Sequence, residues 1–276
     1  KEMQVYVSRE GATIQTRPAA REVTIRDLFT HTAGLTYGFL GGHPVAELYT
    51  ERNIQSGTAH DMVAHLAELP LLFDPGTQWN YSVATDVLGC LIELISDQPL
   101  DDFFREQIFQ PLGMVDTDFY VPAEKISRFA ACYDYAQSDD GRDSFVPSNS
   151  PTADRYHARP AFLSGGGGLV STLSDYFQFT QMLLNYGANN GKQILGRKTV
   201  ELMTCNHLPN NVDLSGMGMP VFSETPYDGI GFGLGVSVVL NPASAQILGS
   251  PGEYAWGGLA STAFWNDPSE EMTVIF

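Results

Sequence analysis

The chain has 276 residues, of which 43% are hydrophobic and 17% are charged, and it carries a formal net charge of −17 at pH 7. This composition is typical of a folded globular protein, and the length predicts one large domain or two lobes that share a core. The acidic balance argues against nucleic-acid binding, which needs basic side chains to neutralise phosphates, and against electrostatic docking on an anionic membrane.

The three cysteines, Cys90, Cys132 and Cys205, are too sparse and too widely spaced to indicate a disulfide framework or a set of metal ligands. No apolar run reaches the length of a membrane-spanning helix. The sequence starts at Lys1 and stops inside the alternating run "EMTVIF" (residues 271–276), which resembles a strand cut short. We therefore expect the chain to be truncated at both ends.

Two segments in the first half, residues 21–35 and 57–70, each place a threonine three residues before an aspartate. The two pairs are Thr24 with Asp27 and Thr58 with Asp61. This spacing resembles a capping box, in which each side chain satisfies a backbone N–H at the start of a helix. We expect the first helix to end near Gly34 and the second at Pro70.

The next helices are predicted from apolar residues at helical spacing. After the turn signal Pro75-Gly76, such residues recur up to residue 95 and predict a helix that begins near Tyr81 or Ser82. A further helix is expected over residues 100–114, where two aspartates in the first turn suit the helix dipole.

The middle of the chain is polar. Residues 136–160 are rich in Ser, Asp and Pro and predict a long loop. Residues 163–187 contain four consecutive glycines and then a helix that we expect Ser174 to cap and Gly187 to end. Residues 196–208 predict another short helix.

From residue 226 the pattern changes to strands separated by turns, and we expect these strands to be antiparallel neighbours. The runs are residues 227–240, 252–267 and 270–276. A helix-rich half followed by a strand-rich end predicts an α+β or two-lobed α/β architecture. We expect one domain over 1–276, with a mainly helical lobe over 21–164 and a sheet-containing lobe made of 165–276 and 1–20.

Several common catalytic and cofactor motifs are absent from this sequence. It contains neither G-x-S-x-G nor H-E-x-x-H, and the pair His60 and His65 is spaced five apart, which does not suit chelation from one helix face. The run Gly165–Gly168 is not followed by G-K-[ST], so it is not a phosphate-binding loop. Residues 231–235 lack the glycine spacing of a dinucleotide site.

Two features could carry chemistry. Tyr81 stands where a loop is expected to become a helix, and a helix N-terminus together with a nearby lysine could make its phenolate accessible as a general base. The alternative is a packing residue with a satisfied hydroxyl. The second feature is Trp256-Gly257-Gly258, where two glycines in a strand suggest close approach to the backbone, for example by a substrate carbonyl.

These features belong to five segments that occur in the order found in one family. The segments are "TIRDLFTHTAGLTYG" (24–38), "FDPGTQWNYSVATDVLG" (73–89), "QPLGMVDTDFYVP" (110–122), "GGGGLVSTLSDYFQF" (165–179) and "YAWGGLASTAFWNDP" (254–268). Through them the chain resembles the serine β-lactamase and DD-peptidase superfamily over nearly its whole length, and most of all the family VIII carboxylesterases related to class C β-lactamases. The resemblance implies a two-lobed α/β (α+β) fold, with a helical lobe and an antiparallel sheet flanked by helices.

Members of that family use three motifs. The second, Tyr-x-Asn or Tyr-Ser-x, falls on Tyr81-Ser82-Val83, and the third, Lys-Thr-Gly or Trp-Gly-Gly, falls on residues 256–258. The first, Ser-x-x-Lys, supplies the nucleophile and its lysine partner. No serine of this sequence has a lysine three residues on, and we expect the motif upstream of residue 1. A non-catalytic binding or regulatory protein on the same fold is the alternative.

The resemblance implies acyl transfer through a covalent acyl-enzyme, with Tyr81 as the general base and the backbone N–H of Leu259 in the oxyanion hole. It requires no metal and no organic cofactor. Other residues are candidates to contact the substrate, or else are structural: Ser82 as a helix cap, the aromatic residues as core. These candidates are Ser82, Val83, Trp256, Gly257, Gly258, Tyr254, Tyr37 and Phe39.

Two departures from the β-lactamase pattern bear on the substrate. β-Lactamases usually carry Asn at the position of Val83 and Lys at the position of Trp256, and both are polar groups that suit an anionic amide. We therefore expect a small-molecule carboxylic ester with a short acyl chain as substrate. The alternatives are a β-lactamase, a D-amino-acid peptidase or a transesterase of the same superfamily.

Overall fold

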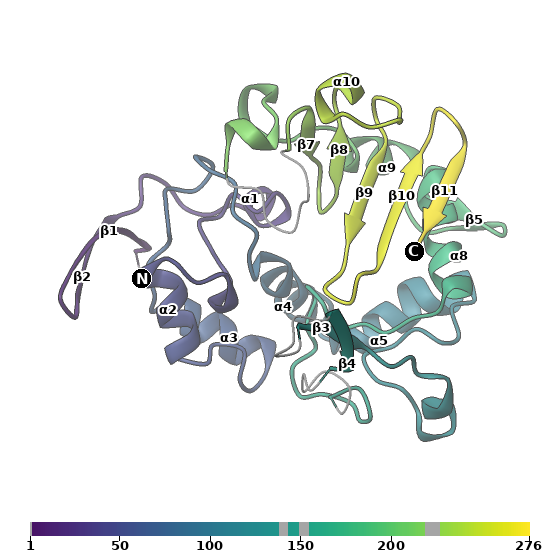
Figure 1. Ribbon diagram of the computed structural model, residues 1–276, viewed down its shortest axis with the longest axis horizontal. Helices are drawn as coiled ribbons and strands as arrows, with labels where there is room; N and C mark the ends of the chain where they lie inside the picture. Colours follow the sequence, from purple (N-terminus) through teal and green to yellow (C-terminus); the bar gives the residue numbers. More distant parts are fainter. Residues whose placement is uncertain (1, 138–142, 149–154, 219–226) are drawn as a thin grey trace.

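The computed structural model describes residues 2–137, 143–148, 155–218 and 227–276. In Figure 1 the first helices lie on one side of the molecule and a five-stranded sheet lies on the other, with α4 (Ala84–Ser96) between them. The α/β architecture with an antiparallel sheet is therefore the one expected. Of the helices described, none combines the length and the apolar character needed to cross a bilayer.

The chain begins with an antiparallel hairpin of β1 (Gln4–Glu10) and β2 (Thr13–Pro18). The hairpin is tied to the helical side, because the N–H of Tyr6 donates to the carbonyl of Leu71 and the N–H of Leu71 donates to that of Gln4. Figure 1 shows it beside α2 (Pro44–Glu51), far from the sheet. We expected the first twenty residues to join the sheet lobe; in the structure β1 pairs with β2, and Val5 of β1 also forms a bridge with Leu71 on the helical side.

The two predicted capping boxes are present, at the starts of α1 and α3, and the helices end earlier than expected. The N-terminal helical elements are α1 (Ile25–Phe29), η1 (Gly38–Leu40), α2 (Pro44–Glu51), α3 (Ala59–Leu66) and α4 (Ala84–Ser96). Helix α1 stops before Gly34 because His31 adopts a left-handed backbone conformation, with φ of 54°. Helix α3 tightens into three-residue turns that reach Leu69, just before Pro70.

Helix α4 packs against α1 and α3 and begins later than predicted. Its first helical residue is Ala84 and its N-cap is Val83, so Tyr81 and Ser82 lie in the extended segment that leads into the helix. Asp97, in the left-handed conformation, ends it. The prediction of a helix here is confirmed, and the predicted start is wrong by two or three residues.

The helix expected over residues 100–114 is present as three consecutive pieces: α5 (Leu100–Phe104), the π-helix η2 (Arg105–Phe109) and α6 (Gln110–Leu112). The wider π turn precedes Pro111, which has no N–H to donate and whose ring would meet the carbonyl of Gln107 in α geometry. The short helix η3 (Ala123–Arg128) follows.

The expected loop over residues 136–160 is partly a hairpin, in which β3 (Tyr133–Gln137) pairs with β4 (Asp143–Pro147). Aromatic and β-branched residues, which favour extended chain, supply these strands, for example Tyr135 opposite Phe145. Part of the predicted loop, residues 138–142 and 149–154, lies outside the described residues.

Helix α8 (Leu173–Leu184) is capped by Thr172, whose hydroxyl accepts from the N–H of Asp175. The expected cap at Ser174 is therefore wrong by two residues, because Ser174 already lies inside the first turn. The short hairpin β5 (Ala188–Asn189) and β6 (Lys192–Gln193) and the predicted helix α9 (Arg197–Met203) follow.

The sheet has the strand order β11-β10-β9-β8-β7 with every pair antiparallel, as expected. The remaining elements are η4 (Pro209–Asn211), η5 (Leu214–Gly216), β7 (Ile230–Phe232), β8 (Ser237–Val239), α10 (Pro242–Ala245), β9 (Tyr254–Gly257), β10 (Ala263–Asp267) and β11 (Met272–Ile275). Helix α8 packs on β10 and β11. There the amide of Asn266 donates to the carbonyl of Thr180.

The helical side and the sheet meet through a small apolar cluster. Trp79, which precedes α4, packs with Phe232 of β7, and their ring centroids are 5.6 Å apart. Tyr81 and Trp256 pack against the same cluster. The second and third family motifs therefore lie at the boundary between the two sides.

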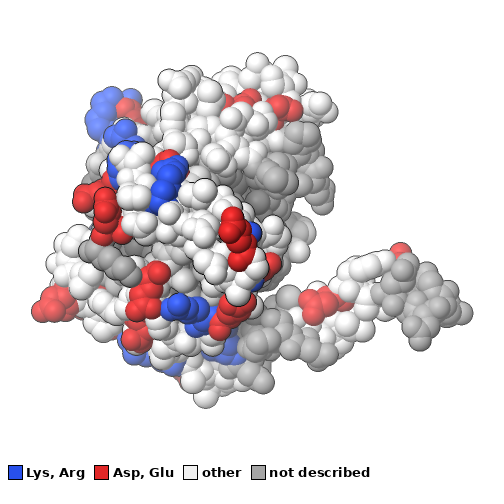
Figure 2. Space-filling view, turned by 90° about the vertical axis from the view of Figure 1, so that its left-hand side faces the viewer, with Lys and Arg blue, Asp and Glu red and all other residues white. Residues whose placement is uncertain are grey.

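Acidic and basic side chains alternate on the face that carries the N-terminal hairpin and α2, as Figure 2 shows. Ion pairs such as Arg17 with Asp74 join them. The net charge of −17 is therefore not gathered into one acidic patch on this face.

Candidate active site

Tyr81 lies half-buried within a ring of aromatic side chains. Its ring centroid is 5.0 Å from that of His31, 5.1 Å from that of Tyr37 and 5.6 Å from that of Trp256. Trp256 comes from β9, so the fold joins two motifs that are far apart in the sequence.

The phenol oxygen of Tyr81 takes part in side-chain hydrogen bonds with Tyr37 and Trp256, and the indole N–H of Trp256 can only donate. Burial raises the pKa of Tyr81, these two hydrogen bonds lower it, and the nearby carboxyl of Asp86 raises it again; the net effect is a raised pKa. Tyr81 lies three residues before Ala84, the first residue of α4, so it is not at the helix N-terminus that we expected to favour the phenolate.

Tyr37 and Phe39 follow α1 and stack on each other, with centroids 4.8 Å apart and planes 23° apart. They have different environments, because Tyr37 is 7% exposed and Phe39 is 62% exposed. Burial and the neighbouring Asp86 raise the pKa of Tyr37. Tyr37 is thus an interior partner of Tyr81 rather than a wall for substrate, whereas Phe39 is open to a ligand.

Asp86 is a residue that our sequence analysis did not single out. It lies in the first turn of α4, is 1% exposed, and accepts hydrogen bonds from Oγ of Ser164 at 2.5 Å and from the N–H of Gly166 at 3.1 Å. Its other oxygen has no hydrogen-bond partner among the residues that the structure describes. Burial raises the pKa of this carboxyl. An acidic residue on the apolar face of a predicted helix was the signal that could have revealed it.

Ser82 and Val83 were expected to touch substrate, and the structure places both in the interior, 1% and 0% exposed. The hydroxyl of Ser82 is 3.1 Å from Nδ1 of His31 and accepts from the N–H of Ala84 at 3.3 Å. Val83 belongs to the helical core. The expectation of substrate contact is wrong for both, because the turn into α4 points these side chains inward.

The residues around the third motif also differ in their exposure to solvent. Tyr254 is 2% exposed in the core beneath the sheet, and its hydroxyl accepts from the amide of Asn266 at 2.9 Å, so it does not wall a pocket. Leu259 lies in the turn between β9 and β10 and is 85% exposed. A Cβ added at Gly258 would come too close to Oγ1 of Thr262, so a larger residue there would require the Thr262 side chain to move.

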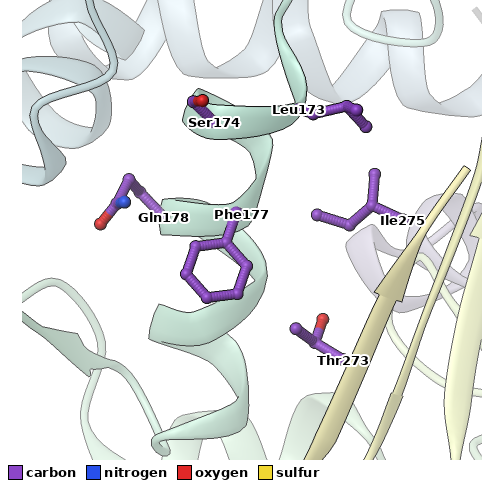
Figure 3. A pocket seen from close by; sticks show the side chains of 6 residues that line it. All are labelled: Leu173, Ser174, Phe177, Gln178, Thr273 and Ile275. Carbon is purple, nitrogen blue, oxygen red and sulfur yellow. The ribbon is translucent and has the colours of Figure 1, made fainter.

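Two other features of the described residues were considered as sites, a surface hollow and a set of metal ligands. A hollow of about 430 Å³ lies between α8 and β11, where Phe177 and Ile275 face each other across it (Figure 3). None of its lining residues belongs to the second or the third catalytic motif, residues 81–83 and 256–258. Within the described residues no three His, Cys, Asp or Glu side chains are placed to hold a metal ion.

The chain belongs to the Beta-lactamase family, which matches residues 6–276. It is 36% identical over 271 residues to Protein Rv1367c of Mycobacterium tuberculosis, covering 96% of this chain and 64% of that protein. It is 30% identical over 275 residues to Esterase EstB of Burkholderia gladioli, covering 92% of this chain and 64% of the esterase.

The structure is similar to that of EstCE1, described as a hydrolase with promiscuous acyltransferase activity. The TM-score is 0.71 at 27% identity, over 92% of this chain and 66% of the other. The resemblance to the serine β-lactamase and DD-peptidase superfamily, and its fold, are thereby confirmed. The chain spans 64% of the length of the two curated relatives named above.

Proposed function

We propose that the full-length protein is a serine hydrolase that cleaves carboxylic esters through an acyl-enzyme. The observation that carries the proposal is the meeting of Tyr81 and Trp256, with the phenol oxygen held by side-chain hydrogen bonds from two directions. The relationship to EstB, which is named an esterase, supports ester cleavage as the reaction.

In this mechanism a Ser-x-x-Lys motif, expected upstream of these residues, supplies the nucleophile. The raised pKa of Tyr81 means that the phenol alone is a weak base at neutral pH. A lysine ammonium beside it would favour the phenolate, which could then take the serine proton and return it to the leaving alkoxide. The N–H of Leu259 would donate to the oxyanion.

Neutral esters suit this site better than anionic lactams. Trp256 stands where β-lactamases usually carry a lysine, and its only donor takes part in the hydrogen bond with Tyr81, so it presents no cation. The exposed ring of Phe39 is an apolar surface near Tyr37. We propose short acyl chains for the substrate.

The test is hydrolysis of p-nitrophenyl butyrate by the full-length protein and by Tyr81→Phe. We expect kcat to fall by about 10³-fold in the variant, because the proton acceptor is lost. Tyr133→Phe, on the exposed strand β3, is the matched control and should keep wild-type turnover. Near-normal turnover by Tyr81→Phe would contradict the assigned role.

Two further measurements separate the alternatives. A kcat/KM for nitrocefin well above that for the ester would instead indicate a β-lactamase. A coding sequence without Ser-x-x-Lys upstream of residue 1 would indicate a non-catalytic protein on this fold.

A further inference from the structure

His31 makes a contact with each of four consecutive residues of the Tyr81 segment. Its ring is 6.1 Å from that of Trp79 and 5.0 Å from that of Tyr81, centroid to centroid. Its carbonyl accepts from the N–H of Asn80 at 2.9 Å, and its Nδ1 lies 3.1 Å from Oγ of Ser82. One residue therefore touches the whole segment from its interior side.

The backbone of His31 is unusual for a residue with a side chain, because its φ of 54° lies in the left-handed region. Such conformations persist where the surrounding structure holds them, and they concentrate at functional sites. Here the left-handed turn ends α1 and leaves both the carbonyl and the ring directed at the same neighbouring segment.

The His31–Ser82 hydrogen bond lies in an apolar, buried environment. Oγ of Ser82 accepts from the N–H of Ala84 and still has a proton and a second lone pair, so the tautomer of His31 decides which of Oγ and Nδ1 donates. The ring is 3% exposed and Phe232 packs on it at 5.7 Å. Burial lowers the pKa of His31 to about 3, so the imidazole is neutral at working pH and does not exchange protons with Tyr81.

We propose that His31 is the positioning residue of Tyr81: through its carbonyl, its ring and its hydrogen bond with Ser82, it holds the phenol in register with the acyl-transfer site. Its effect on activity rests on the esterase function proposed above. Its effect on the placement of Tyr81 does not, and the two can be measured separately.

The kinetic test compares His31→Asn and His31→Gly in the full-length protein. Both residues tolerate a left-handed backbone, but only Asn keeps a short hydrogen-bond acceptor. We expect kcat for p-nitrophenyl butyrate to fall by about 10–100-fold in His31→Gly, with KM changed by less than about twofold, since misplacement of a catalytic group affects the chemical step. His31→Asn should retain more of kcat than His31→Gly.

His43→Asn is the matched control. Nδ1 of His43 also accepts a hydrogen bond, from the N–H of Val45 at 3.1 Å, but it caps α2 on the helical side. Asparagine is an equally good cap, so we expect unchanged kinetics. A uniform loss in all three histidine variants would show a general stability effect and would overturn the proposal.

A double-mutant cycle with Ser82→Ala tests the hydrogen bond itself. If His31 and Ser82 act through one bond, His31→Gly with Ser82→Ala should have nearly the same kcat as the weaker single variant. Additive losses would contradict the coupling. Ser82→Ala removes a single oxygen and provides the readout if His31→Gly does not fold.

The readout that does not need esterase activity is the ¹³Cζ resonance of Tyr81 in tyrosine-labelled protein. We expect it to shift in His31→Gly and Ser82→Ala, and to stay unchanged in His43→Asn. An unmoved resonance in a folded His31→Gly variant would overturn the proposal even if the protein is an esterase. A shifted resonance in a protein without esterase activity would support the positioning role and refute only the proposed function.

Discussion

At the scale of single residues, opposing effects act on the pKa of Tyr81. Burial and the carboxyl of Asp86 favour the neutral phenol, while the hydrogen bonds with Tyr37 and Trp256 favour the phenolate. The protonation of Tyr81 is therefore sensitive to the loss of either hydrogen bond. A cation placed nearby would shift the same balance toward the base.

Removing the hydroxyl of Tyr37 tests this balance. A hydrogen bond to the anion lowers a pKa, so Tyr37→Phe should raise the pKa of Tyr81 and move the acid limb of the kcat/KM profile upward by about one pH unit. Phe39→Leu, which changes the stacked neighbour without removing a donor, should leave the limb in place. Superimposable pH profiles for wild type and Tyr37→Phe would show that the bond does not act on catalysis.

Trp256 is the residue to which we assign the preference for esters. Trp256→Lys supplies the cation that β-lactamases usually carry at this position. We expect the ratio of kcat/KM for nitrocefin to that for p-nitrophenyl butyrate to rise by about tenfold, the size of one hydrogen bond to a charged group. If both substrates lose activity equally, Trp256 supports Tyr81 without selecting the substrate.

At the scale of elements, the run of four glycines allows close packing against α4. Gly165 lies against Gly89 of α4, and a Cβ added at Gly165 would be 2.6 Å from the carbonyl oxygen of Thr85. Gly166 donates its N–H to Asp86 on the same helix. The run is thus a close-packed contact that holds the helix following Tyr81, not a phosphate-binding loop.

Two alanine substitutions in this run should differ sharply. Gly165→Ala should lower the free energy of unfolding by about 1–3 kcal/mol, because the new methyl group has no room. Gly167→Ala is the matched control, since a Cβ there meets nothing within 4 Å. Urea unfolding of the two variants gives the comparison. Equal free energies of unfolding would show that the structure accommodates the methyl group at residue 165 without loss of stability.

At the scale of the whole molecule, the site depends on the joining of the two sides. Trp79 and Tyr81 come from the helical side, and Phe232 and Trp256 come from the sheet. His31 lies against Trp79, Tyr81 and Phe232. Because this buried histidine spans the junction, its protonation should couple to global unfolding.

The acid stability of the full-length protein measures that coupling. The pKa of His31 is about 3 when folded, against about 6.5 when unfolded, so the histidine's contribution is complete above pH 6.5 and is lost as pH falls toward 3. The advantage of wild type over His31→Asn in unfolding free energy should therefore shrink by roughly 4 kcal/mol across this range. A constant difference between the two proteins would show that the ring is not held neutral.

Features that depend on neighbours in sequence could be predicted. The capping boxes at Thr24 and Thr58 were correct because a cap is satisfied within one turn. The antiparallel strands at the end were correct because turns separate apolar runs. Helix ends were less predictable: α1 stops at the left-handed His31, whose conformation is held by the distant segment around Asn80 and Ser82.

The sequence by itself determined the family and the helices of the first half, and it singled out Tyr81 and Trp256 as candidates, since motif spacing and local periodicity are written along the chain. Only the tertiary structure decided which of the chosen residues face inward. Ser82, Val83 and Tyr254 are buried, and Asp86 and His31 stand beside the site. Burial and hydrogen bonding arise between residues far apart in sequence, so apart from Asp86, an acidic residue on an apolar helix face, no local pattern could assign these side chains.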